Sequence, residues 1–395
     1  MSDVARLPWV AGQIRVPNWL TPTQMGRALA CPLSAILGST LETDDRLPPD
    51  PRAILGTVLH KVVEDSAMGR VTFQGRPREA LRHHLDRLLA DQEKRLREIG
   101  LGRYVPLRST QHYTEYLERV NRALRQAESF AREAAPHVAE RTALRGQPAD
   151  RAVPEQKVAS ESLRLVGRVD WWEEHGDEVK VRDLKTGVVR EGDRIARHVE
   201  FQLRLYGLLA VEARPGKRVR LFVDHEGTEE LPWGDAEEAE TRAQVAAIRR
   251  DLPSGQVVDP TAVAQVGEAC RWCDVRHHCV RYRTEAPRLW TTTDLGFVPP
   301  QDIAGDITEA VLQKDPTTVR LRDLGGRHVT IAALQALHGD FWLLPPTTQL
   351  WFFGLEPRGS TKDPDGRYRH PTNFRELAMG PGERPAWRLR VLRGL

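Results

Sequence analysis

The chain has only four cysteines, and their positions constrain its fold more than any other feature. Cys270, Cys273 and Cys279 fall in one short segment, CRWCDVRHHC, whereas Cys31 lies near the N-terminus. Chains that stay in the reducing cytosol do not normally keep disulfides. The clustering of three cysteines therefore indicates a metal centre. The cysteines also bracket all the other motifs described below.

Composition sets broad limits on the class of protein. The 395 residues permit two or three domains, and 40% hydrophobic with 29% charged residues suits a folded chain with a real core. No apolar run is long enough to span a membrane, and the N-terminus lacks the apolar region of a secretory signal. We therefore expect a cytoplasmic protein. The net charge of +3 is too small to identify a nucleic-acid ligand by itself.

A β-hairpin is predicted in the middle of the chain. Strands over residues 162–172 and 179–184 flank the turn His175-Gly176-Asp177. Residues two apart on a strand point to the same face, so Asp183 and Lys185 share one. The hairpin can bring Asp170 beside them.

Two carboxylates next to a lysine suit phosphodiester hydrolysis. The carboxylates can hold Mg²⁺ or Mn²⁺, and the main-chain carbonyl of Leu184 could add an oxygen ligand. Lys185 could orient the attacking water and offset negative charge. Taken alone, the Asp-x-Lys pattern of residues 183–185 is more typical of a solvated, salt-bridging strand face, and the neighbouring motifs are needed to favour a catalytic site.

Two helices carry further candidates. His60 lies between Gly56 and Glu64 at four-residue spacing, on a helix expected to begin near residue 54. A neutral histidine ring can bind a metal, although a lone helical histidine is more often structural. Gln202 and Tyr206 share a face of a helix over residues 199–211. They could bind a phosphate or a base, or could form the polar edge of an amphipathic helix.

The remaining pattern indicates two domains. Long helical segments over residues 78–99 and 110–144 form a helical insert at about 70–150, and residues 21–37 read as one short helix carrying Cys31. A boundary is expected between residues 286 and 287. Residues 287–395 look β-rich and OB-like. Their aromatic residues and arginines suit single-stranded nucleic acid or, equally, a core with a solvated face; the residues concerned are Arg320, Arg322, Trp351, Phe352 and Phe353.

These motifs resemble a known family. GTVLHKVVED, GRVD, DLK and QLRLY occur in the order seen in RecB-like nucleases of the PD-(D/E)XK superfamily. The distal cysteine segment, with Cys31 followed by Pro32, resembles the iron–sulfur subset of that family. This subset includes CRISPR-associated RecB-like exonucleases and the AddB nuclease domain. The resemblance covers about residues 19–282, is weak over 70–150 and is absent from the C-terminal region.

The resemblance implies a fold and a site. The fold is a restriction-endonuclease-like α/β arrangement, with a mixed sheet flanked by helices. The implied metal ligands are His60, Asp170, Asp183 and the Leu184 carbonyl, the catalytic lysine is Lys185, Gln202 and Tyr206 form the following motif, and Glu64 and Glu155 are accessory acids. The implied cofactors are Mg or Mn together with a 4Fe-4S cluster.

The resemblance also implies that all four cysteines hold this cluster. Thiolates are natural ligands of such clusters. The alternative is a zinc ion held by three cysteines with His277 or His278. The cluster is favoured because the order of the cysteines matches the family.

The expected activity is that of a DNA nuclease, an exonuclease on single strands or DNA ends in repair or antiviral defence. The sequence has no P-loop motif, so any helicase motor or defence-system protein would be a separate partner. A nucleic-acid-binding or assembly subunit with incidental hydrolysis is the rival interpretation, and an RNA nuclease is a weaker one.

Overall fold

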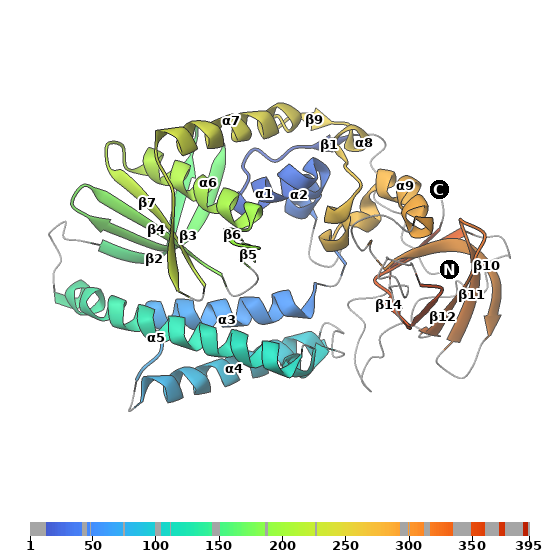
Figure 1. Cartoon of the computed structure of the whole chain (residues 1–395), viewed down its shortest axis with the longest axis horizontal. Coiled ribbons are helices and arrows are strands. Elements are labelled where there is room, and N and C mark those ends of the chain that lie inside the picture. The colour runs from blue at the N-terminus through green and yellow to red at the C-terminus, as the bar shows by residue number, and fades with distance from the viewer. Residues whose placement is uncertain are drawn as a thin grey trace.

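A five-stranded mixed sheet flanked by helices forms the larger part of the computed structural model, and a β-rich region follows it (Figure 1). The structure describes residues 13–41, 46–47, 49–73, 76–98, 104–110, 112–143, 151–185, 189–225, 227–292, 299, 301–311, 317–334, 349–359, 371–375 and 390–393. Within these ranges, no helix has the length and apolar character needed to cross a membrane.

The central sheet contains the expected hairpin. Its strands are β2 (Arg151–Ser160), β3 (Leu165–His175), β4 (Glu178–Leu184), β7 (Arg218–Asp224) and β8 (Thr228–Leu231), in the order β2-β3-β4-β7-β8. Neighbours are antiparallel except β4 and β7, which are parallel. The crossover between these two strands passes through α6 (Arg197–Ala213). The predicted α/β fold with a mixed sheet is confirmed.

Helices cover both faces of this sheet (Figure 1). On one face, α6 packs with α1 (Pro22–Ala30) and α7 (Asp235–Asp251) over a core that includes Trp172. On the other face, α3 (Pro51–Ala67) and α5 (Tyr113–Ala143) pack over Trp171 and Leu184. The outer helix α4 (Pro77–Glu98) packs against α3 and α5 and forms the expected helical insert together with α5.

The prediction of a single helix over residues 21–37 is wrong. The segment forms two helices, α1 and α2 (Pro32–Thr40), and Cys31 joins them with an extended backbone. The residue before a proline avoids the helical region, and proline is favoured at a first helical position. Pro32 therefore ends one helix and starts the next. This break places the buried Cys31 at the joint between two packed helices, where its sulfur faces the segment that carries the other cysteines.

The other cysteines follow two short helical turns, η4 (Glu268–Trp272) and η5 (Arg276–His278), before α9 (Val280–Thr291). The expected boundary at residue 287 falls inside α9, and residues on both sides of it share one hydrophobic cluster. Short elements complete this part of the chain: β1 (Ile14–Arg15), η3 (Leu107–Ser109), β5 (Arg190–Glu191), β6 (Arg194–Ile195), β9 (Val257–Val258) and α8 (Pro260–Val263).

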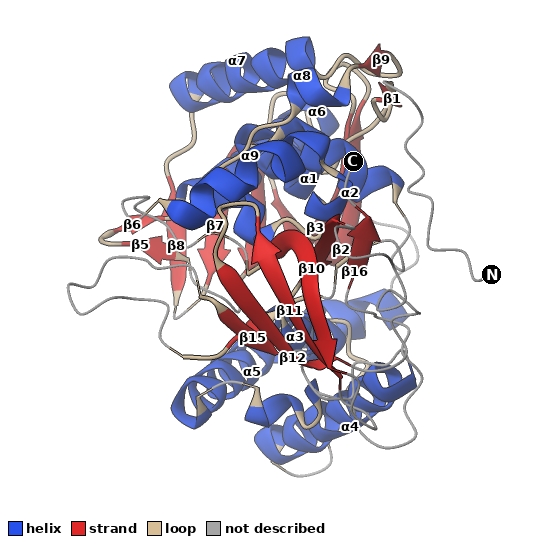
Figure 2. Ribbon diagram, turned by 90° about the vertical axis from the view of Figure 1, so that its right-hand side faces the viewer, coloured by secondary structure: helices blue, strands red, loops and turns tan. Residues whose placement is uncertain are grey.

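The C-terminal region is β-rich, as expected. Figure 2 views the molecule from this end and shows β10, β11 and β12 side by side. The strands are β10 (Ile303–Val311), β11 (Thr317–Asp323), β12 (His328–Leu334), β13 (Gln349–Phe353), β14 (Glu356–Pro357), β15 (Asn373–Arg375) and β16 (Arg390–Arg393), in the order β14-β15-β12-β11-β10-β13-β16. The OB-like closure stays a prediction, because several connections lie outside the described residues.

The aromatic residues of this region belong to the core. Trp351, Phe352 and Phe353 are each at most 2% exposed and pack with residues of the cysteine segment and α9. The suggestion that they bind nucleic acid is therefore wrong. Arg320 pairs with Glu309 on the surface. This agrees with the other interpretation, a core of aromatic residues with arginines on a solvated face.

Candidate functional site

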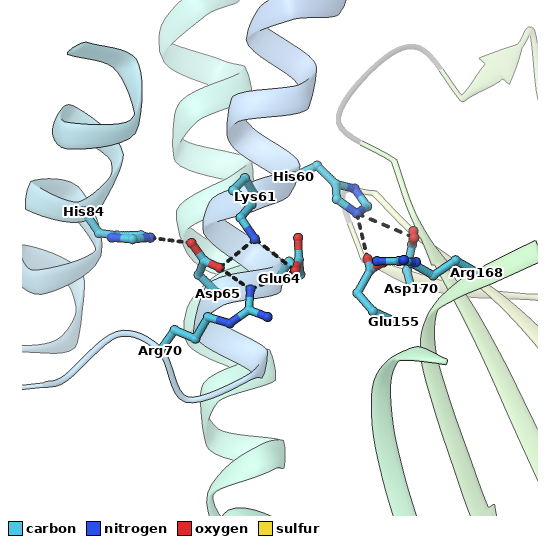
Figure 3. A network of polar contacts seen from close by, with 9 residues as sticks. All are labelled: His60, Lys61, Glu64, Asp65, Arg70, His84, Glu155, Arg168 and Asp170. Atoms are coloured by element: carbon cyan, nitrogen blue, oxygen red, sulfur yellow. Dashed lines mark hydrogen bonds and ion pairs between the residues drawn. The ribbon is translucent and has the colours of Figure 1, made fainter. Parts of the chain in front are cut away.

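Three side chains from three elements converge beside the sheet (Figure 3). His60 of α3 lies with its Nε2 3.7 Å from Glu155 Oε1 on β2 and 3.5 Å from Asp170 Oδ1 on β3. One ligand atom from each lies within 4.8 Å of the other two, a spacing that could hold one metal ion. A nitrogen with two carboxylate oxygens is a set of donors that suits Mg²⁺ or Mn²⁺.

An irregular point in the sheet positions the two carboxylates. The pairing of β2 with β3 runs from Pro154 opposite Trp171 to Gln156 opposite Val169, and it skips Glu155 and Asp170. Glu155 has a φ of 55°, which is rare outside glycine. Such interruptions redirect side chains and are frequent next to active sites. Both acids thereby leave the regular pleat and reach towards His60.

The end of β4 completes this arrangement. The β3–β4 pairing stops at Trp171 opposite Arg182. Beyond it, the Leu184 amide donates to Asp170 Oδ2 over 2.7 Å. This bond fixes the Asp170 carboxylate at the end of the hairpin away from its turn, where the two strands are no longer paired. The structure thus gives Leu184 a role through its N–H, while the expected role of its carbonyl stays a prediction.

Asp183 and Lys185 lie on one face, as the strand alternation predicts. Lys185 Nζ lies 2.6 Å from Asp183 Oδ2 and donates to Gln202 Oε1 over 3.0 Å. Asp183 is 2% exposed, so its buried carboxylate depends on the Lys185 ammonium for charge compensation. The charge of Asp183 also acts on Asp170. A divalent ion bound beside these acids would reduce their mutual repulsion.

Charge crowding perturbs the acids and the histidine. Burial, and then the charge of Asp183, raise the pKa of Asp170 to about 7. Burial lowers the pKa of His60, but the hydrogen bond to Glu155 and the charges of Asp170 and Asp183 outweigh it, so the net shift is upward. Crowded carboxylates that favour a proton also favour a divalent cation in its place.

Tyr206 of α6 is buried close to Asp170 and Asp183. It is 7% exposed, and burial together with the nearby aspartates raises its pKa. Its ring atom Cε1 would be 2.8 Å from a side-chain carbon placed on Gly167. The glycine of the GRVD motif is therefore required for the close approach of α6 to β3. Through this contact the helix that carries Gln202 is held against the site.

Glu64 binds Lys61 and Arg70 in a polar network on α3 (Figure 3). It also lines a small pocket together with His60, Glu155 and Asp170, so its accessory role stays a prediction. Arg204, on the same helix as Gln202 and Tyr206, pairs with Glu200 and Glu240.

Sequence reasoning missed Arg168, whose Nε lies 3.4 Å from Glu155 Oε2. It also missed the Asp65–His84 contact of 2.9 Å that ties α3 to α4. Only Arg168 had an available signal, its position inside the GRVD motif. Asp65 and His84 lie on helices whose mutual packing the pattern does not specify.

A cleft of about 1550 Å³ opens over the site. His60, Lys185 and Gln202 line it, and its wall extends along α3, α4 and α5. Cationic and acidic side chains both line it; the cations are Arg52, Lys61, Lys94, Arg95, Arg119, Arg122, Lys185 and Arg190. A polyanion such as nucleic acid would find cations along the whole wall.

The four cysteines line one smaller cavity of about 290 Å³. No three of their sulfur atoms lie within 4.8 Å of one another. Four sulfurs around a single zinc ion would lie only about 3.8 Å apart, given zinc–sulfur bonds of about 2.3 Å. His277 and His278 are buried outside the lining of the cavity.

Backbone amides support the sulfurs. The Gln265 amide donates to Cys31 over 3.5 Å, and the Tyr282 amide donates to Cys279 over 3.3 Å. Bonds of this kind to ligand sulfur stabilise its thiolate form and tune a bound cluster. The joint of α1 and α2 thus meets the segment after α8, and the two ends of the α/β unit come together here.

Comparison with known proteins identifies one family. The model of the PD-(D/E)XK nuclease superfamily matches residues 20–280. The match spans α1 to the start of α9 and so includes all of the site residues described above and the four cysteines. No curated protein matches the chain significantly.

Proposed function

The chain belongs to the PD-(D/E)XK nuclease superfamily, and on that premise we propose that it is a divalent-metal-dependent deoxyribonuclease. Members of this superfamily are nucleases, which hydrolyse phosphodiester bonds. The observation that carries the proposal is the convergence of His60, Glu155 and Asp170 beside the Asp183–Lys185 pair. A superfamily member that had lost its activity would not need to keep these groups together.

The residues divide the chemical work. His60, Glu155 and Asp170, with the carboxylate of Asp183 beside them, would hold Mg²⁺ or Mn²⁺. When bound, the ion lowers the pKa of water and neutralises charge that develops on the phosphate. Lys185 supplies a positive charge at a fixed position, because Asp183 and Gln202 both bind its ammonium. It can therefore orient a water molecule for in-line attack and stabilise the transferring phosphate.

The substrate is proposed to be DNA, cut as an exonuclease from single strands or DNA ends. Support comes from the cleft, which has a volume of about 1550 Å³ and carries cations on the three helices α3, α4 and α5. The biological setting we propose is repair or antiviral defence. A helicase or defence-system protein would be a separate partner, and the compartment would be the cytoplasm.

The central experiment compares wild type with Asp183→Ala on 5′- and 3′-labelled single strands in Mn²⁺. We expect cleavage by wild type, loss of at least about a hundredfold in the variant because a buried charge partner of Lys185 and a metal ligand are removed, and retained binding. The label that is released first gives the polarity. If wild type cuts no DNA but binds it, a binding or assembly subunit is the better description. Competition with RNA of the same sequence tests the choice of nucleic acid.

We also propose that Cys31, Cys270, Cys273 and Cys279 hold a 4Fe-4S cluster. The support is the cavity of about 290 Å³ that all four cysteines line, together with thiolates being the natural ligands of such clusters. Anaerobically purified protein should be brown and contain iron and sulfide in equal amounts. A colourless protein with one zinc per chain would contradict this.

A further inference from the structure

The cleft over the catalytic residues has one wall that the proposed chemistry does not use. Trp272, from the cysteine segment, lines the cleft together with His60, Lys185 and Gln202. The same residue lines the cysteine cavity. Trp272 therefore stands between the proposed metal site and the four cysteines, at a position where a bound polymer would pass.

Trp272 is unusually exposed for its type. Its side chain has the largest apolar surface of any residue, yet it is 64% exposed. Other tryptophans of the chain, such as Trp171 and Trp172, are at most 2% exposed. Leaving an indole in water forgoes the free energy of burying it. An exposed aromatic side chain on a cleft wall is typical of a ligand contact.

The backbone beneath Trp272 is held in place. It ends the turn η4 and lies between Cys270 and Cys273, and the Cys273 amide donates to the Cys270 carbonyl over 3.2 Å. The guanidinium of Arg276 donates to the Cys273 carbonyl over 3.0 Å. A ring on such a fixed segment loses little conformational entropy when a ligand binds.

Arg271 adds a positive charge to the same surface. Its guanidinium carbon lies 4.8 Å from the centroid of the Trp272 ring, in cation–π contact. A flat aromatic ring next to a guanidinium is the combination that binds stacked bases of single strands, with the cation near the phosphates. Cations on α4 and α5 continue the wall of the cleft, among them Arg95 and Arg122.

We propose that Trp272 stacks on an unpaired base of the substrate strand while a phosphate of that strand lies at the metal site. This inference rests on the proposed nuclease function and narrows its substrate to single-stranded nucleic acid. Bases of a duplex are already stacked on their neighbours, so a single aromatic side chain gains little from them. Trp272 would thus favour single strands over duplexes. It would also fix the number of nucleotides between the stacked base and the bond that is cut.

The test removes one base at a time. A set of labelled single strands, each with one abasic nucleotide at a different distance from the labelled end, is bound by the full chain in Ca²⁺. Binding is followed by fluorescence anisotropy, and gels verify that strands stay intact. For wild type we expect one distance at which the missing base weakens binding about tenfold. With Trp272→Ala this dependence should disappear, and with Trp272→Phe most of it should return.

Controls separate stacking from loss of structure. Tyr113 is 67% exposed at the start of α5 and does not line the cleft, so Tyr113→Ala should bind every strand as wild type does. Thermal unfolding and the content of any cluster should be equal in the Trp272 variants and wild type. If Trp272→Ala fails to fold, Trp272→Leu takes its place in the abasic series, because leucine keeps apolar bulk but has no aromatic face that could stack on a base.

Three outcomes would overturn the inference. The first is a dependence on abasic position that survives in Trp272→Ala. The second is an equal loss of binding to single strands and duplexes, which would indicate a protein contact or a structural role. The third is normal cleavage with no effect of any Trp272 variant, which leaves the nuclease function standing. A wild-type chain that neither binds nor cuts nucleic acid would instead refute the proposed function itself.

Discussion

Glu155 of β2 lies within ligand distance of His60 and Asp170, so it is a candidate ligand of the same metal ion. The family resemblance implied only an accessory role for it. The physical reason is non-local: a bend in β2 matters only once β2 is paired with β3. The Asp-x-Lys pattern, in contrast, is contained in one strand, and alternation alone predicts its geometry.

Replacing Glu155 tests this placement. Glu155→Gln removes one charge from the three ligands, so we expect Mn²⁺ to bind about 10- to 100-fold more weakly, with a similar fall in cleavage at low metal. Calorimetric titration with Mn²⁺ measures the affinity. Glu161→Gln is the matched control, since Glu161 lies in the β2–β3 turn, 71% exposed, and pairs only with Arg164 among the described contacts. Equal affinity in both variants would exclude Glu155 as a ligand.

The pKa of Asp170 predicts a dependence of stability on pH. Folding raises this pKa to about 7, from about 3.9 in an unfolded chain. Between these values the folded chain keeps a proton that the unfolded chain has released. The contribution of Asp170 to the free energy of unfolding is therefore full at low pH and is lost as pH rises through about 7.

Thermal unfolding in EDTA measures this effect. The melting temperature of wild type relative to Asp170→Asn should fall between pH 5 and pH 8, because the amide does not ionise. Saturating Mg²⁺ should remove the fall, since the ion compensates the charge. A difference between the two proteins that stays constant over this range would show that Asp170 titrates normally.

At the scale of elements, the close contact at Gly167 joins strand β3 to helix α6. A methyl group there would meet the Tyr206 ring at 2.8 Å and Leu209 at 3.1 Å, both on the buried helix α6. We expect Gly167→Ala to destabilise the fold by about 1–3 kcal/mol through overpacking. It should also reduce cleavage, because α6 carries Gln202, which binds Lys185.

Denaturant unfolding compares this variant with Gly26→Ala. Gly26 lies within α1 with nothing near enough to clash, so alanine there should be neutral or stabilise by about 0.5–1 kcal/mol. A Gly167→Ala protein as stable as wild type would mean that α6 can shift away from β3 without cost.

The sequence predicted elements where one local signal dominated. The hairpin of β3 and β4 follows from alternation around the turn His175-Gly176-Asp177. It did not predict β2, because RAVPEQKVAS contains a proline and no clean alternation. The break at Cys31 was missed although Pro32 encodes it. Which helix packs on which face of the sheet required the tertiary structure.

At the scale of the whole molecule, a buried ion pair couples the cysteine segment to the β-rich region. Asp302, at the start of β10, is fully buried and binds Arg276 through both oxygens, at 2.7 and 2.9 Å. The Tyr282 hydroxyl and the Gly354 amide also donate to it. Arg276 lies between Cys273 and Cys279 and lines the cavity of the four cysteines. The ion pair therefore connects the β-rich region directly to that cavity.

We expect Asp302→Ala to cost about 3–5 kcal/mol, because it leaves the Arg276 charge buried without a partner. The matched control is Glu309→Ala in the same strand, which removes a surface pair with Arg320 and should cost at most about 1 kcal/mol. Urea unfolding gives both values. Similar small losses would show that the β-rich region and the α/β unit are coupled only weakly.

The most direct test of the account is the anomalous diffraction of Mn²⁺ bound to crystals of the wild-type chain. The account predicts a peak in contact with His60 Nε2 and with carboxylate oxygens of Glu155 and Asp170, next to the ammonium of Lys185. The central claim would be contradicted if, at saturating Mn²⁺, the peaks lay elsewhere and none contacted His60, Glu155 or Asp170.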